Sequence, residues 1–307
     1  MARLYQPSQH FPVNRRDSTH YEIYTVKEPG FPQARRRPPA PASETSSQVS
    51  MAMLAEFRPF ATWTVEDMAA TQRNLLPRRL NGAGVLDVAS RYLPSDLYEG
   101  VGGDWFDTIP LPDGRIALVV GDVTGHGIYA AAGMGRMRTA VRTLTYEGLP
   151  PHELLAHLDH LVVRLAEEED HGGAPTDPTG ATCLYALYDP ATRRCVMAAA
   201  GHPPPALLHP SGEVSFPRLL SGTPIGVGLA SFESLELELD RGTVLALYTD
   251  GLIETRGSDL EAGMRRLGAA LARAPRTLDD LCASVIGSIV GDGPAEDDVA
   301  LLVARTR

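Results

Sequence analysis

From residue 85 onward, short apolar runs of strand length are interrupted by helical segments only twice, each time by two helices in succession. The first pair is expected at 128–144 and after Pro150-Pro151, where leucines recur at helical spacing. The second pair is expected at roughly 258–272 and 278–290, the latter with Thr277 and Asp280 placed as a capping box. The expected strands are 85–93, 115–120, 181–188, 195–200, 206–209, 244–248 and 299–303.

This order of segments favours an α+β sandwich of mainly antiparallel strands. Strict alternation of one strand with one helix is absent, so a doubly wound parallel sheet is not expected. The sequence Pro112-Asp113-Gly114 has the turn chemistry of a hairpin. It is expected to join strand 85–93 to strand 115–120.

The segment before these strands has a different composition. Residues 1–50 are basic, then proline-rich, then rich in Ser and Thr, with little to bury, so a disordered extension is expected there. Residues 51–82 are expected to form a helical linker, because the pattern is helix-like from Met51 to Arg79 and is then ended by Gly82 and Gly84. The expected globular domain therefore covers residues 83–305.

Charge and cysteine content narrow the class of protein. The formal net charge of −10 argues against nucleic acid as a partner. Cys183, Cys195 and Cys282 are odd in number and lack Cys-x-x-Cys spacing, which is typical of a reduced protein rather than a disulfide or zinc framework. Neither a signal-peptide core nor a run of about 18 apolar residues is present. We therefore expect a soluble, cytoplasmic protein with no membrane partner.

Aspartates stand at the edges of four apolar strand-like runs. Asp104 follows Val-Gly-Gly, Asp122 follows a strand ending in Val-Gly, and Asp250 follows a strand ending in Tyr-Thr. Asp297 and Asp298 precede the last strand. One aspartate at a strand end is more commonly a turn or cap residue, but four such places are hard to explain as surface charge. Carboxylates gathered at one edge of a core raise one another's pKa unless a cation neutralises them.

The ligand chemistry of such a cluster indicates the kind of metal. Oxygen-only ligation selects hard divalent ions, so Mn²⁺ or Mg²⁺ is expected rather than zinc. The same oxygens suit both ions. Two ions bridged by a shared aspartate can activate a water and hold phosphoryl oxygens in place.

Five motifs carry these aspartates and two histidines. They are Val101-Gly102-Gly103-Asp104-Trp105-Phe106-Asp107, Gly121-Asp122-Val123-Thr124-Gly125-His126-Gly127, Ala200-Gly201-His202-Pro203-Pro204-Pro205, Tyr248-Thr249-Asp250-Gly251-Leu252-Ile253-Glu254 and Glu296-Asp297-Asp298-Val299-Ala300-Leu301-Leu302. In this order, and with a spacing of 18 residues from Asp104 to Asp122, they resemble the PPM-type (protein phosphatase 2C superfamily) domain of bacteria. The resemblance covers about Gln72 to Val303 and is to the branch of the stage II sporulation protein E phosphatase and the stress sigma-factor regulators.

The resemblance implies an αββα four-layer sandwich, two metal ions, and hydrolysis of phosphoserine or phosphothreonine in a protein. Carried over by position, it implies that Asp104 and Asp122 bind the first and second metals, with Asp122 bridging and the Val123 carbonyl assisting. Asp250 and Asp297 complete the shell of one metal. These four aspartates are the expected catalytic residues.

The resemblance also suggests partners. The usual substrates in this branch are small anti-anti-sigma proteins, so a phosphorylated regulator of that kind is expected. The run 72–80 resembles the linker helix that joins a sensor to the catalytic domain in the same branch. Its presence suggests pairing with a second copy, giving a homodimer, or with a separate sensor.

Some alternatives stay open at this level. A non-catalytic scaffold of a sigma-regulatory switch, or a phosphohydrolase acting on a small molecule, would share much of this pattern. Asp298 is the less expected ligand of its pair, but the sequence does not exclude it. His126 is a candidate proton donor to the leaving oxygen, although a histidine between glycines is more often a positioned turn residue. His202, beside three prolines, is expected to form hydrogen bonds in a rigid turn.

For two further groups of side chains, a purely structural role is the alternative to a role in substrate binding. Arg136, Arg138 and Arg142 lie on the helix after the second motif and could meet phosphate, although a solvated helix face is the commoner role at this spacing. Trp105 and Phe106 are expected in the core rather than on a substrate platform.

Overall fold

The computed structural model describes residues 74–95, 102–125, 127–169, 180–254, 259–291, 295 and 297–307. The expected extension at 1–50, most of the expected linker at 51–82, and His126 lie outside these residues. Within them, eleven strands form two sheets, and four α-helices lie in two pairs.

One sheet contains the C-terminal strand at an interior position and is antiparallel throughout. Its strands, in spatial order, are β1 (Leu86–Leu93), β11 (Val299–Thr306), β10 (Val244–Tyr248), β6 (Ala206–Leu208) and β7 (Val214–Ser215). We call it the β10–β11 sheet.

The second sheet, called here the β3–β4 sheet, has one parallel pair at its edge. Its strands, in order, are β2 (Trp105–Pro110), β3 (Ile116–Val123), β4 (Ala181–Asp189), β5 (Arg194–Ala200) and β8 (Ser221–Gly222), with β9 (Leu235–Glu238) also paired to β5.

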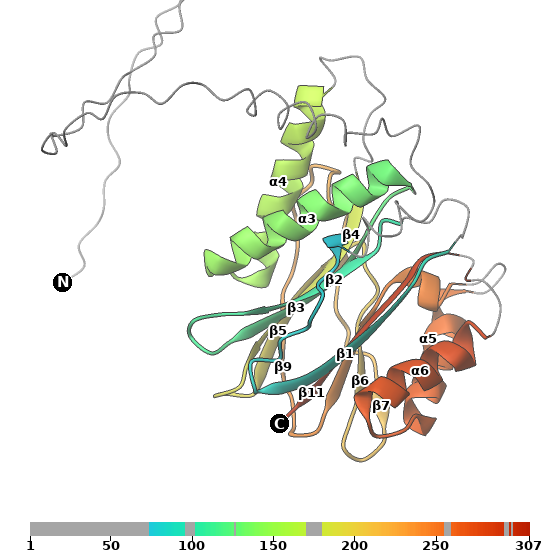
Figure 1. Ribbon diagram of the computed structural model, residues 1–307. Helices are drawn as coiled ribbons and strands as arrows, with labels where there is room; N and C mark the ends of the chain where they lie inside the picture. Colours follow the sequence, from blue (N-terminus) through green and yellow to red (C-terminus); the bar gives the residue numbers. More distant parts are fainter. Residues whose placement is uncertain are drawn as a thin grey trace, which may run out of the picture. The chain divides into compact units, whose positions relative to one another are not determined.

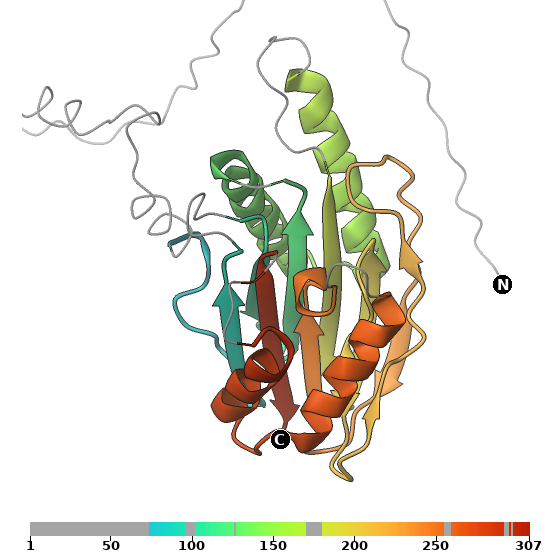
Figure 2. The same cartoon turned by 90° about the vertical axis from the view of Figure 1, so that its right-hand side faces the viewer.

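The sheets face each other, and each has a pair of helices on its outer side (Figures 1 and 2). Helices α3 (Ile128–Tyr146) and α4 (Pro151–Glu169) cover the β3–β4 sheet. Helices α5 (Leu260–Arg273) and α6 (Leu278–Ile289) cover the β10–β11 sheet, and a short 3-10 turn, η2 (Asp250–Leu252), follows β10. The expected α+β sandwich of four layers is therefore confirmed.

This layering explains why the central strands read as uninterrupted apolar runs. A strand that is covered on both faces has no solvent side, so the usual alternation of apolar and polar residues disappears. Strand β10 is buried along its whole length, and β11 along all but one residue. Burial of this kind contributes about 25 cal/mol per Å² of apolar surface removed from water.

Two local expectations were wrong. The turn at 112–114 joins β3 to β2, whereas β1 pairs with β11 in the other sheet. Strand β2 is not among the predicted strands because Asp107 and Pro110 interrupt its apolar pattern. At the start of α6, the Thr277 hydroxyl donates to the Asp280 carboxylate instead of capping a backbone N–H.

Among the described residues, no helix has the length and apolar character needed to cross a lipid bilayer.

Candidate metal centre at one end of the sandwich

Antiparallel pairing places two aspartates side by side in the β3–β4 sheet. Trp105, the first residue of β2, is paired with Gly121 near the end of β3. Asp104, directly before β2, therefore lies next to Asp122, the second-last residue of β3. Asp104 is only 2% exposed.

Antiparallel pairing also places two aspartates at one end of the β10–β11 sheet. Tyr248, the last residue of β10, is paired with Leu301 near the start of β11. Asp250 follows β10 and Asp298 precedes β11, so both lie at this end of the sheet. Gly251 lies so close that a Cβ atom on it would come within 2.1 Å of the Asp298 carbonyl oxygen.

Thr249 joins the two sheets at this end. Its hydroxyl donates to Oδ2 of Asp104 at 2.7 Å and accepts from the backbone N–H of Ala300 at 2.8 Å. The side chain is fully buried. Thr249 thus holds a carboxylate of one sheet against a strand of the other, a role that sequence reasoning missed.

The glycines of the first motif allow its backbone to pack directly against the second and fifth motifs. A Cβ atom on Gly102 would lie 1.4 Å from Oδ2 of Asp298, and one on Gly103 would lie 2.0 Å from the Val123 carbonyl oxygen. Only a residue without a side chain leaves room for these contacts. The first motif is therefore in direct contact with the second and the fifth.

The third motif reaches the same end through His202, which is 2% exposed. Its Nε2–H donates to the Tyr248 carbonyl at 3.0 Å, and its Nδ1 accepts from the Thr182 hydroxyl at 2.9 Å. Burial lowers the pKa of His202 to about 4. This agrees with a neutral imidazole in which one nitrogen donates and the other accepts a hydrogen bond. The expected role in turn hydrogen bonding is confirmed.

Burial and mutual repulsion raise the pKa values of four of the carboxylates at this end of the sandwich. We call Asp104, Asp122, Asp250, Asp297 and Asp298 the aspartate cluster. Burial first, and then the charge of Asp122, raise the pKa of Asp104 well above its usual range. Burial, followed by the charges of Asp250, Asp297 and Asp298, raises the pKa of Asp122 to about 8. The pKa values of Asp250 and Asp298 are also raised, mainly by burial.

The two neighbouring aspartates of the fifth motif have different surroundings. Asp298 is 7% exposed, and its Oδ1 accepts from the Ser95 N–H at 2.9 Å. Asp297 is exposed and accepts from the N–H of Asp298 at 2.8 Å. Its charge nevertheless raises the pKa of both Asp122 and Asp250. Both residues therefore act on the cluster.

These donors fit hard divalent ions. In the described part of the chain, no three carboxylate, imidazole or thiol groups converge as a complete ligand set. Zinc sites normally need three or four such protein ligands, whereas Mg²⁺ keeps several waters and is often bound by only one or two carboxylates. A cation between the buried aspartates would also remove their mutual repulsion.

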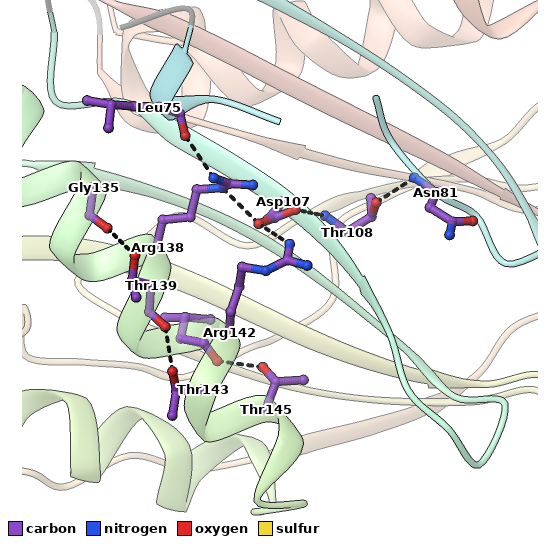
Figure 3. A network of polar contacts seen from close by, with 11 residues as sticks. Leu75, Asn81, Asp107, Thr108, Gly135, Arg138, Thr139, Arg142, Thr143 and Thr145 are labelled. Atoms are coloured by element: carbon purple, nitrogen blue, oxygen red, sulfur yellow. Dashed lines mark hydrogen bonds and ion pairs between the residues drawn. The ribbon is translucent and has the colours of Figure 1, made fainter. Parts of the chain in front are cut away.

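Two arginines of α3, Arg138 and Arg142, contact Asp107 of β2 (Figure 3). Arg138 Nε lies 2.8 Å, and Arg142 Nη1 2.7 Å, from the same oxygen of Asp107, a buried residue of β2. These two are therefore neither phosphate ligands in the aspartate cluster nor a freely solvated face. Trp105 and Phe106 are buried, as expected.

Comparison with known proteins identifies relatives of this chain. The family model described as "Stage II sporulation protein E (SpoIIE)" matches residues 112–307, which include Asp122, Asp250 and Asp297. Protein IcfG of Synechocystis sp. (strain ATCC 27184 / PCC 6803 / Kazusa) is 26% identical over 263 residues, covering 76% of this chain and 40% of the relative. Phosphoserine phosphatase RsbU of Bacillus subtilis (strain 168) is 23% identical over 193 residues, covering 62% of this chain and 54% of the relative.

Solved structures share the fold. The RsbU and RsbW domains of Rv1364c from Mycobacterium tuberculosis superpose with a TM-score of 0.62 at 32% identity, covering 73% of this chain and 60% of that one. The SiaA-PP2C domain of Pseudomonas aeruginosa gives a TM-score of 0.61 at 21% identity, covering 86% and 99%. The chain thus spans about half the length of the curated relatives it matches.

Proposed function

The chain belongs to the Stage II sporulation protein E (SpoIIE) family, as its motifs predicted, and on this basis we propose that it is a divalent-metal-dependent protein serine/threonine phosphatase. The observation that carries the proposal is that Asp104, Asp122, Asp250 and Asp298 lie at the same end of the two stacked sheets. Names of relatives, including phosphoserine phosphatases RsbU and RsbP of Bacillus subtilis (strain 168), agree with it.

In this proposal Asp104, Asp122, Asp250 and Asp297, assisted by the Val123 carbonyl, would hold two divalent ions, Mn²⁺ or Mg²⁺, with Asp122 as the shared ligand. Asp297 is assigned from the resemblance of the fifth motif, and its charge, which raises the pKa of both Asp122 and Asp250, agrees with that assignment.

Asp298 is assigned a positioning role. Its carboxylate is already engaged by the Ser95 N–H and packed against Gly102. Comparing Asp297→Asn with Asp298→Asn for Mn²⁺ affinity tests the assignment. A larger loss in Asp298→Asn would reverse it.

The protein's own groups prepare the site for a phosphate monoester. Bound divalent ions lower the pKa of water and neutralise phosphoryl oxygens. Thr249 orients Asp104 through its hydrogen bond, and Gly102, Gly103 and Gly251 allow the backbone to pack closely around the carboxylates. His202 fixes the end of β10 while staying neutral.

The substrate and setting follow from the resemblance of the five motifs. We propose that the substrate is a phosphorylated protein of the anti-anti-sigma type, and that the enzyme acts in the cytoplasm. The catalytic domain is assigned to 83–305 and a linker to 51–82, through which a second copy or a separate sensor would act.

Hydrolysis of a phosphoserine protein with Mn²⁺ tests the activity. Wild type should release phosphate only with the metal, and Asp250→Ala or Asp122→Ala should lose at least about 100-fold, since even partners of metal ligands cost 10–100-fold when removed. Asp113→Ala, an exposed turn residue, is the control and should keep its activity. Near-wild-type turnover in Asp122→Ala would refute the mechanism.

The same assay separates the alternatives. A non-catalytic scaffold would hydrolyse neither the phosphoprotein nor p-nitrophenyl phosphate with Mn²⁺. A small-molecule phosphohydrolase would prefer nucleotides to both a phosphoserine peptide and a phosphorylated anti-anti-sigma protein.

A further inference from the structure

A polar cavity of about 450 Å³ lies between the segment 77–81, strand β2 and helix α3. Four arginines line it, Arg78, Arg79, Arg138 and Arg142, together with the single carboxylate of Asp107. Its lining therefore carries a formal charge of +3, in a chain whose net charge is −10. We call it the arginine cavity.

Asp107 fixes two of the arginines but does not neutralise them. One of its oxygens accepts a hydrogen bond from Arg142 at 2.7 Å and forms an ion pair with Nε of Arg138 at 2.8 Å, and its side chain is only 2% exposed (Figure 3). The side chains of Arg138 and Arg142 are 22% and 36% exposed. Arg138 also donates to the Leu75 carbonyl at 2.9 Å. The pair is thus preorganised, keeps one net positive charge, and remains open to the solvent side.

Arg78 and Arg79 add charge that no described carboxylate balances. Both side chains are exposed. Arg78 donates to the Asn74 amide oxygen at 2.7 Å, which is a neutral partner. No carboxylate in the part of the chain that the structure describes lies within ion-pairing distance of either arginine. Like charges at one cavity repel, and an anion that enters it would relieve that repulsion.

The cavity is separate from the aspartate cluster. Asp107, the lining residue nearest to the cluster in sequence, is three residues after Asp104, which is about 10 Å along a strand, and Arg142 is 14 residues into α3, about 20 Å along a helix axis. Its charge is also opposite in sign, so the two sites select different ligands.

The chemistry of the lining identifies the ligand class. Guanidinium groups present paired N–H donors that match the oxygens of a phosphate, and several such contacts suit a doubly charged group better than a carboxylate. The cavity volume falls within the range of small-molecule sites, and Tyr146, which is 55% exposed, adds a ring at its edge. We propose that the arginine cavity binds a small phosphate-bearing anion, either inorganic phosphate or a phosphate monoester such as a nucleoside monophosphate.

A bound anion would tie the segment 77–81 to α3. The Asn81 N–H donates to the Thr108 hydroxyl at 2.9 Å and so connects that segment to β2. Contacts from Arg78 and Arg79 to the same anion as Arg142 would add a second connection. This inference does not depend on the proposed phosphatase activity.

Calorimetric titration of the full chain tests the proposal. The protein is stripped of metals with a chelating resin, because a soluble chelator is itself an anion, and is titrated with inorganic phosphate and with AMP at constant ionic strength. Saturable binding is expected, weakened about tenfold or more in Arg79→Ala and in Arg78→Ala. Tighter binding of AMP than of phosphate identifies a monoester as the ligand, and equal binding identifies phosphate itself.

Two control variants make the result decisive. Arg241→Ala removes an exposed arginine far from the cavity in sequence and should bind like wild type, as should Asp250→Ala. The proposal is overturned if neither anion shows saturable binding, if Arg241→Ala weakens binding as much as Arg79→Ala, or if Asp250→Ala abolishes it. Since the substituted arginines 78 and 79 are exposed, misfolding does not confuse the outcome.

Discussion

Two buried threonines flank β10, and their hydroxyls differ in hydrogen bonding. Thr249 donates to Asp104 and accepts from Ala300. Thr243 is equally buried, but its hydroxyl makes no hydrogen bond within the described residues. A buried hydroxyl without a partner costs free energy, whereas a paired one that orients a ligand supports function.

Thr249→Val is therefore expected to lower kcat/KM about 10–100-fold, because Asp104 loses the group that holds it. Thr243→Val should leave kcat/KM unchanged and unfolding free energy equal or higher. Steady-state kinetics on a phosphoserine protein, with urea unfolding of each variant, provide the measurement. Equal activity of the two variants would show that Thr249 has no positioning role.

Asp122 gives a pH-dependent prediction for the metal-free protein. Its pKa is raised to about 8, first by burial and then by the charge of Asp250, while in the unfolded chain an aspartate titrates near 3.9. The folded state thus holds a proton that the unfolded state releases, so stability falls as pH rises between these values.

Asp122→Asn removes this titration. Without metals it should be more stable than wild type at about pH 8, and the difference should shrink as pH falls towards about 4. Thermal unfolding across pH measures it. Asp113→Asn, at an exposed turn where Arg115 lowers the carboxylate pKa, should show no such gain. A metal-free Asp122→Asn that is less stable than wild type at pH 8 would contradict the electrostatic account.

Among the elements, α4 does more than cover a sheet. Asp159 on this helix is fully buried and accepts hydrogen bonds from the backbone N–H groups of Gly226, Gly228 and Ala230, at 2.7, 3.2 and 3.1 Å. Both glycines have positive φ, and Ala230 does too, at 41°. One carboxylate therefore holds a loop whose backbone conformation is otherwise unfavourable.

Asp159→Ala should destabilise the protein by about 3 kcal/mol, since three buried N–H groups lose a charged acceptor. Amide exchange in 226–230 should rise by more than exchange in the central strands. Urea unfolding and hydrogen exchange measure both effects. An unchanged exchange rate in this loop would show that Asp159 does not organise it.

Elements could be predicted from the sequence where local pattern and tertiary burial agree. Strands β3, β10 and β11 are continuous apolar runs because sheet or helix covers both faces. Strand β2 could not be found in this way, because Asp107 is buried within it by pairing with arginines 31 and 35 residues later. The short strands β7, β8 and β9 have too few residues to show any period.

For the whole molecule, the sequence predicted which motifs meet but not the contacts that join them. Glycines and aspartates at strand ends indicated a common site, since strand ends of stacked antiparallel sheets share an edge. The hydrogen bond from Thr249 to Asp104 spans 145 residues, and that from Ser95 to Asp298 spans 203. Nothing local in the chain specifies such partners, because they follow from how one sheet is stacked on the other.

The central claim is that this end of the sandwich holds two divalent cations between the sheets. Equilibrium dialysis with Mn²⁺, followed by elemental analysis of the protein, measures it directly. The account predicts about two Mn²⁺ per chain for wild type and loss of at least one in Asp122→Asn, with Asp113→Asn unchanged. Wild type that binds no Mn²⁺ at millimolar concentration, or Asp122→Asn that binds as much as wild type, would contradict it.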